Sequence, residues 1–165
     1  ARSRNTVHLD HCCIRRITCV FMRIRFIKAS DTYSLRLEVL RPGGAEEDVH
    51  FANDRLDGAF HLGIQIGEHR ISVASFYPEN HPELLGWKQY RLRGMATHPA
   101  FEGQGAGSKL LKFAIEHLKA QHADLLWCNA REKVVPFYER LGFKVRGPLF
   151  DIPGIGGHYV MHRRV

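Results

Sequence analysis

Short stretches in which apolar and polar residues alternate, or in which apolar residues run together, occur along the chain and predict β-strands. A polar turn at Gly67–Arg70 separates two of these stretches, which predicts a hairpin. The strands predicted in chain order are Met22–Lys28, Ala59–Ile66, Ile71–Phe76, Trp87–Thr97 and Leu125–Cys128. We expect breaks between them at Tyr77–Glu83 and across the polar, acidic residues 45–58.

Apolar residues spaced three and four apart predict helices between these strands. A short helix is expected at Tyr33–Leu40, ended by the proline and glycines that follow it. Another is expected around Val134–Leu141, with Pro136 near its start and Gly142 as its cap. The clearest helix follows Gly107 and buries the face formed by Leu110, Leu111, Ala114, Ile115 and Leu118.

Three glycines connect the strand at Trp87–Thr97 to this helix. Gly103, Gly105 and Gly107 stand two residues apart. Glycines allow a tight turn and leave backbone N–H groups uncovered, while a helix start carries partial positive charge. The segment therefore predicts a cradle for a pyrophosphate.

The spacing of these glycines excludes two common nucleotide motifs. A dinucleotide fingerprint requires Gly-x-Gly-x-x-Gly, and a P-loop requires Gly-x-x-x-x-Gly-Lys-Ser/Thr. Here the third glycine comes one residue early, and Ser108–Lys109 has the reverse order. With a strand before it and a Leu-rich helix after it, Met95–Leu111 instead resembles motif A of the GNAT superfamily of N-acetyltransferases. In that superfamily this loop holds the pyrophosphate of coenzyme A.

A second block, Leu125–Phe143, resembles motif B of the same superfamily. It combines a buried strand, a short helix carrying Phe137 and Tyr138, and Leu-Gly-Phe opening the next strand. The resemblance implies a single-domain α/β fold whose central sheet is mixed, mostly antiparallel and splayed at the acyl-CoA site, with helices on both faces. We expect residues 22–165 to form this acyltransferase domain and residues 1–21 to be a basic N-terminal extension.

The resemblance also implies the residues of the site. The motif-B tyrosine commonly lies beside the sulfur of coenzyme A as a general acid, so Tyr138 is the predicted catalytic residue. The alternative is an aromatic core pair with Phe137. Backbone N–H groups of the central strand are expected at the thioester, and the glycine loop at the pyrophosphate. The predicted cofactor-binding residues are Met95, Ala96, Thr97, Gly103, Gln104, Gly105, Ala106, Gly107, Ser108, Asn129 and Arg131.

Two positions of these motifs, Glu102 and Arg131, depart from the pattern of the superfamily. Glu102 occupies a loop position that is commonly Arg or Gln, and its carboxylate would repel a pyrophosphate. Arg131 replaces a more usual asparagine; it is expected either to donate to the cofactor's phosphates or pantetheine amide, or to be solvated at a helix start. Asn129 either helps to bind the cofactor or only caps the helix.

The general base is not identified by the sequence. Well-known members carry a glutamate on the central strand where this chain has Arg91, and an arginine cannot accept a proton. Either the amine reacts through a chain of water molecules, or another group accepts the proton. The candidates, each also interpretable as a surface or packing residue, are Glu79, Glu83, His50 and His158.

Arg91 and Arg93 flank Leu92 on the central strand, so their side chains are predicted on one face near the acyl end. If that face belongs to the acceptor cleft, the substrate carries a carboxylate. The alternative is a pair of salt bridges to Glu79 or Glu83.

Composition limits the partners of the chain. Its 165 residues, 44% of them hydrophobic, suffice for one core. Of the net charge of +7, residues 1–21 contribute +3 (four arginines against Asp10), which leaves +4 for the rest. That excess suits an anionic cofactor and does not require nucleic acid. No apolar run is long enough to cross a bilayer. We expect no nucleic-acid partner, no membrane partner and a cytoplasmic location.

Cysteines 12, 13, 19 and 128 show no Cys-x-x-Cys spacing, so we expect neither a metal site nor a disulfide scaffold, and Cys128 is expected in the core.

Residues 1–21 are basic and nearly free of acids. We expect Met22 to be the natural start and the preceding segment to be non-native. The alternatives are an Arg-rich transit peptide, an added strand and an arm packing on a neighbour.

The leading function is that of an N-acetyltransferase, which transfers the acetyl group of acetyl-CoA to a primary amine of a small molecule or peptide by direct attack in a ternary complex. A non-catalytic acyl-CoA-binding module is the first alternative, because the usual glutamate is missing. A basic RNA-associated domain is the second, supported only by charge. The amine acceptor is the expected partner, and a homodimer is left open.

Overall fold

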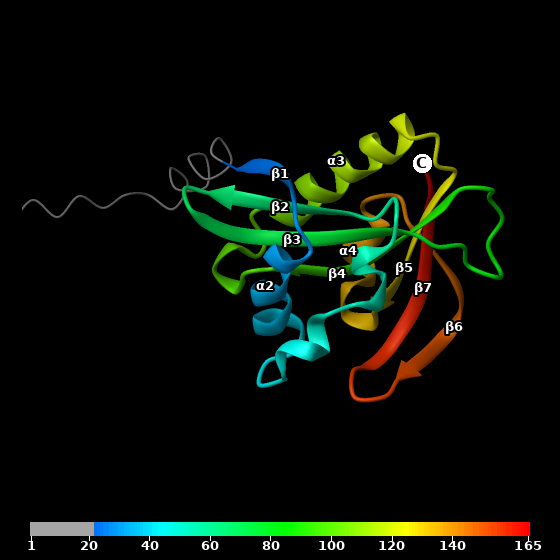
Figure 1. Cartoon of the computed structure of the whole chain (residues 1–165). Helices are drawn as coiled ribbons and strands as arrows, with labels where there is room; N and C mark the ends of the chain where they lie inside the picture. Colours follow the sequence, from blue (N-terminus) through cyan, green and yellow to red (C-terminus); the bar gives the residue numbers. More distant parts are fainter. Residues whose placement is uncertain (1–21) are drawn as a thin grey trace, which may run out of the picture.

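A seven-stranded sheet with helices on both faces forms the framework of the protein, whose computed structural model describes residues 22–165 (Figure 1). This confirms the predicted α/β fold class. The strands are β1 (Arg23–Ile27), β2 (Phe60–Ile66), β3 (His69–Pro78), β4 (Gln89–Thr97), β5 (Leu125–Arg131), β6 (Lys144–Ile152) and β7 (Gly156–Arg164). The helices are α2 (Ser30–Leu40), α3 (Ala106–Ala120) and α4 (Val135–Glu139), with short 3₁₀ turns η1 (Glu46–Val49), η2 (Ala52–Arg55), η3 (Pro99–Phe101) and η4 (Glu132–Val134).

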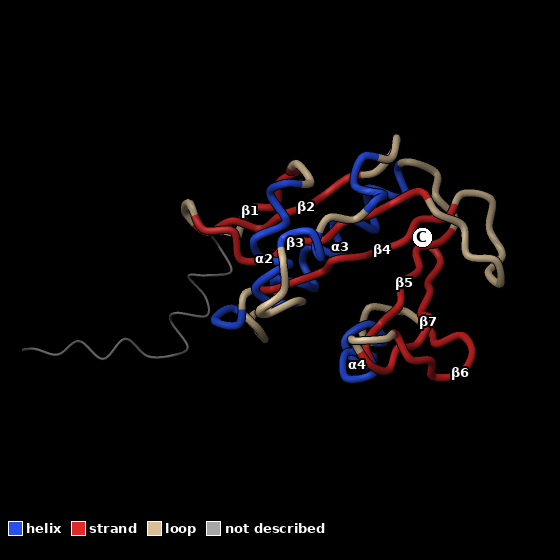
Figure 2. Tube along the Cα trace, turned by 60° about the horizontal axis from the view of Figure 1, so that its bottom comes forward, coloured by secondary structure: helices blue, strands red, loops and turns tan. Residues whose placement is uncertain are grey.

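The strands follow the order β1-β2-β3-β4-β5-β7-β6, and β4–β5 is the one parallel pair among them. These two strands pair only from Gln89–Leu125 to Leu92–Cys128, although both continue further. Beyond that point they diverge, as Figure 2 shows. The sheet is therefore splayed in its middle, as expected.

Two apolar clusters attach the helices to opposite faces of the sheet. On one face, Leu110, Leu111 and Leu118 of α3 pack with residues of β2, β3 and β5, and Tyr138 of α4 joins the same cluster. On the other face, Leu35 of α2 packs with residues of β3 and β4. The spacing of apolar residues in α3 therefore predicted its buried face correctly.

A β-bulge at Gly94 changes the direction of side chains along β4. Ser75 of β3 pairs with Arg93 and Val73 pairs with Ala96, so β4 has one residue more than β3 over this interval. Gly94 adopts a left-handed φ of 60°, which a residue with a side chain rarely does. As a result Met95 packs toward the α3 face of the sheet.

Most predicted elements are present with shifted ends. The strand expected at Met22–Lys28 is β1, and the expected hairpin is β2–β3. The helix expected at Tyr33–Leu40 begins earlier, at Ser30. The central strand begins at Gln89 instead of Trp87.

Three predictions about loops and helix length were wrong. Residues 45–58 contain η1 and η2, because the carboxylates of Asp48 and Asp54 accept hydrogen bonds from backbone N–H groups and tighten the chain. β3 continues through Tyr77 to Pro78, where the break had been expected. The helix of motif B is only α4, which leaves Leu141 in the following turn, ended by Gly142 with φ 82°.

The predictions about residues 1–21 lie outside the described part of the chain. Within residues 22–165, no helix combines the length and the apolar character that a membrane span requires.

Candidate functional site

A cleft of about 930 Å³ opens where β4 and β5 diverge, and its walls come from the end of α2, β4, the glycine loop, β5, α4 and β7. Eleven of the twelve predicted site residues line it: Met95, Ala96, Thr97, Gly103, Gly105, Ala106, Gly107, Ser108, Asn129, Arg131 and Tyr138. The exception is Gln104, whose side-chain amide donates to the carbonyl of Ala100 at 3.1 Å and which is absent from the cleft wall.

The glycine loop leaves open space for an anion. Gly103 and Gly105 have φ values of 70° and 84°, and a Cβ on either would meet no atom within 4 Å. Gly105 is the N-cap of α3, and no side chain caps the N–H groups of the first turn. These groups and the helix dipole suit a pyrophosphate.

Gly107 has a different role from its two neighbours. A Cβ there would lie 3.0 Å from Cε of Met95 and 3.4 Å from Cζ of Phe137. The small residue therefore lets the start of α3 approach β4 and α4 closely.

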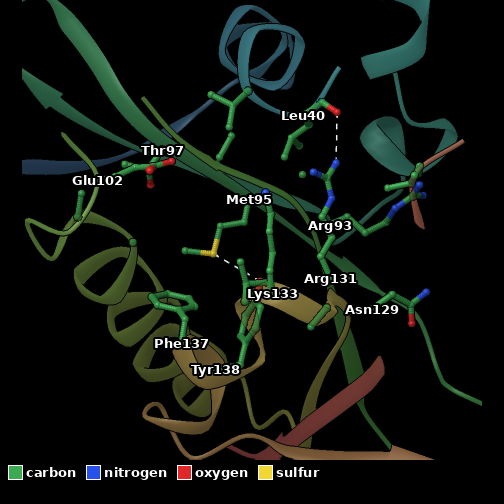
Figure 3. A pocket seen from close by; sticks show the side chains of 18 of the residues that line it. Leu40, Arg93, Met95, Thr97, Glu102, Asn129, Arg131, Lys133, Phe137 and Tyr138 are labelled. Carbon is green, nitrogen blue, oxygen red and sulfur yellow. Dashed lines mark hydrogen bonds between the residues drawn. The ribbon is translucent and has the colours of Figure 1, made fainter. Parts of the chain in front are cut away.

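The hydroxyl of Tyr138 lies beside Met95 in the middle of the cleft (Figure 3). It donates to Sδ of Met95 at 3.8 Å, and the ring of Tyr138 packs edge-on against Phe137 and Phe143. Burial, reinforced by the neighbouring Cys128 thiol, raises the pKa of Tyr138 well above its usual value. The phenol is therefore protonated at neutral pH, as a general acid must be.

Cys128 is buried in β5, as expected. Burial raises the pKa of its thiol to about 12, so it is a neutral packing residue at physiological pH.

The backbone of β4 has no strand partner on the β5 side beyond Leu92. Residues Met95–Thr97 nevertheless remain in the sheet, because Ala96 and Thr97 pair with β3 on the opposite side. This segment is thus held rigidly and has polar backbone groups available to an extended ligand.

Arg91 and Glu79, two residues considered in connection with the base, form a salt bridge at 2.8 Å. The other oxygen of Glu79 accepts from the amide of Asn53 at 3.0 Å. Glu79 is not part of the cleft wall. The alternative interpretation of Arg91 as a salt-bridge residue is therefore correct.

Among the remaining candidate bases, His158 alone lines the cleft. His50 lies near Glu46 at 3.5 Å and Glu83 is exposed, both away from the cleft wall. Nδ1 of His158 is 2.6 Å from the carbonyl of Gly156. Because a carbonyl only accepts, Nδ1 carries the proton, and Nε2 of the neutral ring has a free lone pair.

Glu102 and Arg131, the two residues that depart from the motifs of the superfamily, lie at opposite ends of the cleft (Figure 3). Glu102 is exposed at the glycine loop. Arg131 extends across the cleft and donates to the carbonyl of Leu40 at 3.3 Å. Its guanidinium is thereby held at the end of α2, and burial, followed by the charge of Arg41, lowers its pKa.

A buried arginine behind the cleft was not anticipated from the sequence. Arg36 is fully buried and donates to the carbonyl of Val49 at 2.9 Å, to Asp54 at 3.0 Å, and to the hydroxyls of Ser75 and Tyr77. A Cβ on residue 94 would lie 2.6 Å from its Nε. Arg36 therefore packs directly against Gly94 and supports the bulge of β4 on the face of the sheet that α2 covers.

The sequence did contain a signal for this residue. Thr32, Leu35, Arg36 and Val39 share one helical face, because they are spaced three and four residues apart. An arginine on an otherwise inward face requires a buried acceptor.

Within residues 22–165 there is no group of three or more His, Cys, Asp or Glu side chains able to hold a metal ion.

Comparison with known proteins agrees with this fold and cleft. The chain superimposes on an acyl-CoA N-acyltransferase from Pseudomonas aeruginosa with a TM-score of 0.69, at 18% identity, over 86% of this chain and 99% of the other. It superimposes on the ribosomal-protein-S18-alanine N-acetyltransferase from Escherichia coli with a TM-score of 0.67, at 17% identity, over 87% of this chain and 93% of the other. The chain thus shares its fold with these two proteins.

Sequence comparison identifies the family. The profile of the acetyltransferase (GNAT) family matches residues 29–143. The uncharacterized N-acetyltransferase YitI of Bacillus subtilis (strain 168) is 42% identical over 142 residues, which cover 86% of this chain and 95% of YitI. A shorter match, 43% identical over 60 residues, covers 34% of this chain and 28% of serotonin N-acetyltransferase from Macaca mulatta. The chain belongs to the GNAT family and is an acetyl-CoA-dependent acetyltransferase.

Proposed function

We propose that this enzyme transfers the acetyl group of acetyl-CoA to a primary amine by direct attack in a ternary complex. The observation that best supports the proposal is that the glycine cradle, the unpaired edge of β4, Tyr138 and His158 all open into one cleft. Donor and acceptor can therefore meet without a covalent enzyme intermediate. The acceptor is a small molecule or a peptide with a free amine.

Each part of the cleft has a proposed task. Backbone N–H groups of Gly103–Ser108 bind the pyrophosphate, and backbone groups of Met95–Thr97 bind the pantetheine and the thioester carbonyl. Asn129 and Arg131 are proposed to contact the pantetheine end. Gln104 contributes its backbone alone, because its side chain is bonded to Ala100.

The chemistry requires two proton transfers. The amine nitrogen attacks the thioester carbon, a C–N bond forms and the C–S bond breaks. We assign His158 Nε2 as the acceptor of the proton that the amine loses. Tyr138 donates its proton to the departing sulfur and is reprotonated from solvent. A protonated phenol and a neutral imidazole are the states that these tasks demand.

The experiment that tests this function has two parts. Acetyl-CoA should raise the melting temperature, since a ligand at about a hundred times its Kd stabilises the folded state by about 2.7 kcal/mol. A panel of amines should then release free coenzyme A thiol. Stabilisation without thiol release from any amine would favour the non-catalytic binding module, and no stabilisation would contradict both functions.

A further inference from the structure

Arg93 projects into the cleft from β4 without a carboxylate to balance its charge. Of the three arginines grouped there, Arg91 is paired with Glu79 at 2.8 Å and Arg36 with Asp54 at 3.0 Å. Arg93 has no ion pair or hydrogen bond to a side chain within residues 22–165. The guanidinium therefore lines the cleft without a carboxylate at ion-pair distance.

The surroundings of Arg93 keep it in place and reinforce its attraction for an anion. Its guanidinium carbon lies 4.2 Å from the centre of the Phe51 ring, which covers one face of the group. Burial, followed by the charges of Arg91 and Arg36, lowers its pKa, and the charges of Tyr77 and Glu79 oppose this only in part. A negative ligand in contact with the guanidinium would offset the cost of burial and the repulsion by the other arginines.

The carboxylates in the cleft wall near α2 are already engaged. Glu38 lies 3.4 Å from the imidazole of His98, and Asp48 accepts from the backbone N–H of Ala45 at 2.9 Å. The anion that Arg93 attracts must therefore come from outside the described residues.

The position of Arg93 separates it from the pyrophosphate cradle. It lies four residues before Thr97 on the same strand; because of the bulge at Gly94 this segment spans three residues of β3, about 10 Å along the strand axis. In Figure 3, Thr97 and Glu102 lie on one side of Met95 and Tyr138, while Arg93 and Arg131 lie on the other. The cradle serves the donor, so Arg93 faces the space left for the acceptor.

We propose that Arg93 binds a carboxylate of the acceptor, and hence that the substrate is a small amine that carries an acid group. This inference rests on the function proposed above. A guanidinium holds a carboxylate through paired N–H donors, which fixes the distance and direction of the amine relative to the thioester. Arg93 is a specificity residue in this reaction and transfers no proton.

The test compares amino acids with their primary amides, over a series in which the amine and the acid are separated by increasing chain length. Thiol release from acetyl-CoA gives kcat/KM for each member of a pair. We expect at least one free acid to be preferred over its amide by about ten-fold or more. In Arg93→Gln that preference should disappear through a raised KM, with turnover of the amide retained.

Two further variants complete the experiment. Arg93→Lys should restore part of the preference, because it retains the charge but not the paired geometry. Arg25→Gln removes an exposed arginine from β1 and should leave the preference intact. All three variants should be stabilised by coenzyme A like the wild type, since Arg93 is remote from the cradle.

The outcomes separate this inference from the proposed function. Acetylation of amines with no preference for acids, or a preference that survives in Arg93→Gln, overturns the role of Arg93 and leaves the function standing. If no amine of either kind is acetylated, both are overturned. A preference for acids that is lost in Arg93→Gln and retained in Arg25→Gln supports both.

Discussion

At the scale of single residues, the hydroxyl of Tyr138 is the most informative group in the cleft. A buried tyrosine that serves only the core usually donates to a carbonyl or carboxylate. Here its partners are sulfur atoms, the thioether of Met95 at 3.8 Å and the thiol of Cys128, and both are weak. The hydroxyl is therefore well placed to exchange a weak partner for a group that a ligand brings.

Replacing Tyr138 with phenylalanine should lower kcat by about ten-fold or more, because proton donation to the sulfur is lost. Steady-state kinetics over a range of pH measures this, with Tyr90→Phe as the matched control. Tyr90 is equally buried, but its hydroxyl donates to Gly58 away from the cleft. An unchanged rate at every pH in Tyr138→Phe would reject the assigned acid.

Replacing His158 with glutamine should lower kcat/KM by about a hundred-fold, the range typical of a lost general base. His162→Gln, on the same strand but outside the cleft wall, should keep kcat/KM close to the wild-type value. If His158→Gln also keeps the wild-type kcat/KM, the proton leaves the amine by another route.

At the scale of elements, the sequence predicted what is set locally and missed what depends on distant partners. The alternation of Ala59–Ile66 and the helical spacing after Gly107 are properties of each segment alone, and both elements are present. The bulge at Gly94 requires β3 as its partner, and Arg36 requires an acceptor eighteen residues away. Periodicity places Arg36 on an inward face of its helix, but it identifies neither of these partners.

The same distinction applies to the site. The glycine loop and Tyr138 were predicted from the resemblance of their segments to motifs A and B, and both line the cleft. Arg91 and Arg93 were indistinguishable in the sequence, since both stand on one face of the same strand. Only the position of Glu79 separates them, by pairing with Arg91 and leaving Arg93 uncompensated.

The glycine cradle gives a prediction at the scale of the loop. Gly105→Ala should weaken acetyl-CoA binding by about ten-fold or more, because a left-handed residue with a side chain costs roughly 1–2 kcal/mol and the new methyl group enters the anion's space. Isothermal titration with acetyl-CoA measures the affinity.

Gly67→Ala is the control for that experiment. Gly67 also has a left-handed φ, and a Cβ there meets no atom within 4 Å, but it lies in the β2–β3 turn. Its stability should fall by a similar amount and its affinity should not change. Equal affinity in both variants would contradict the assignment of the cradle.

At the scale of the whole molecule, Arg36 connects α2, the η1 and η2 turns and β3 through one buried guanidinium. Burial by itself would raise the pKa of Asp54, but hydrogen bonds from Arg36 and Tyr77 hold it below its usual value. A carboxyl whose pKa is lowered by folding contributes stability above its unfolded pKa of 3.8, and this stability is lost as the pH falls through the folded value.

Arg36→Met should therefore lower the free energy of unfolding by about 3–5 kcal/mol at neutral pH, because Asp54 remains buried without its partner. Chemical denaturation measures the change. Arg55→Met, at an exposed arginine next to Asp54, should differ from the wild type by less than about 0.5 kcal/mol. A small loss in Arg36→Met would show that water can reach Asp54 and replace the guanidinium.

The short pairing of β4 with β5 has a consequence for how the enzyme turns over. Four residue pairs join the strands β1–β4 to the strands β5, β7 and β6 within the described sheet. If the pantetheine chain lies in the opening, as proposed, it would add hydrogen bonds to the edge of β4 that β5 leaves unpaired, and the cosubstrate would act as a temporary eighth strand. Release of coenzyme A would then remove that strand and be a step at which the sheet itself is partly dismantled.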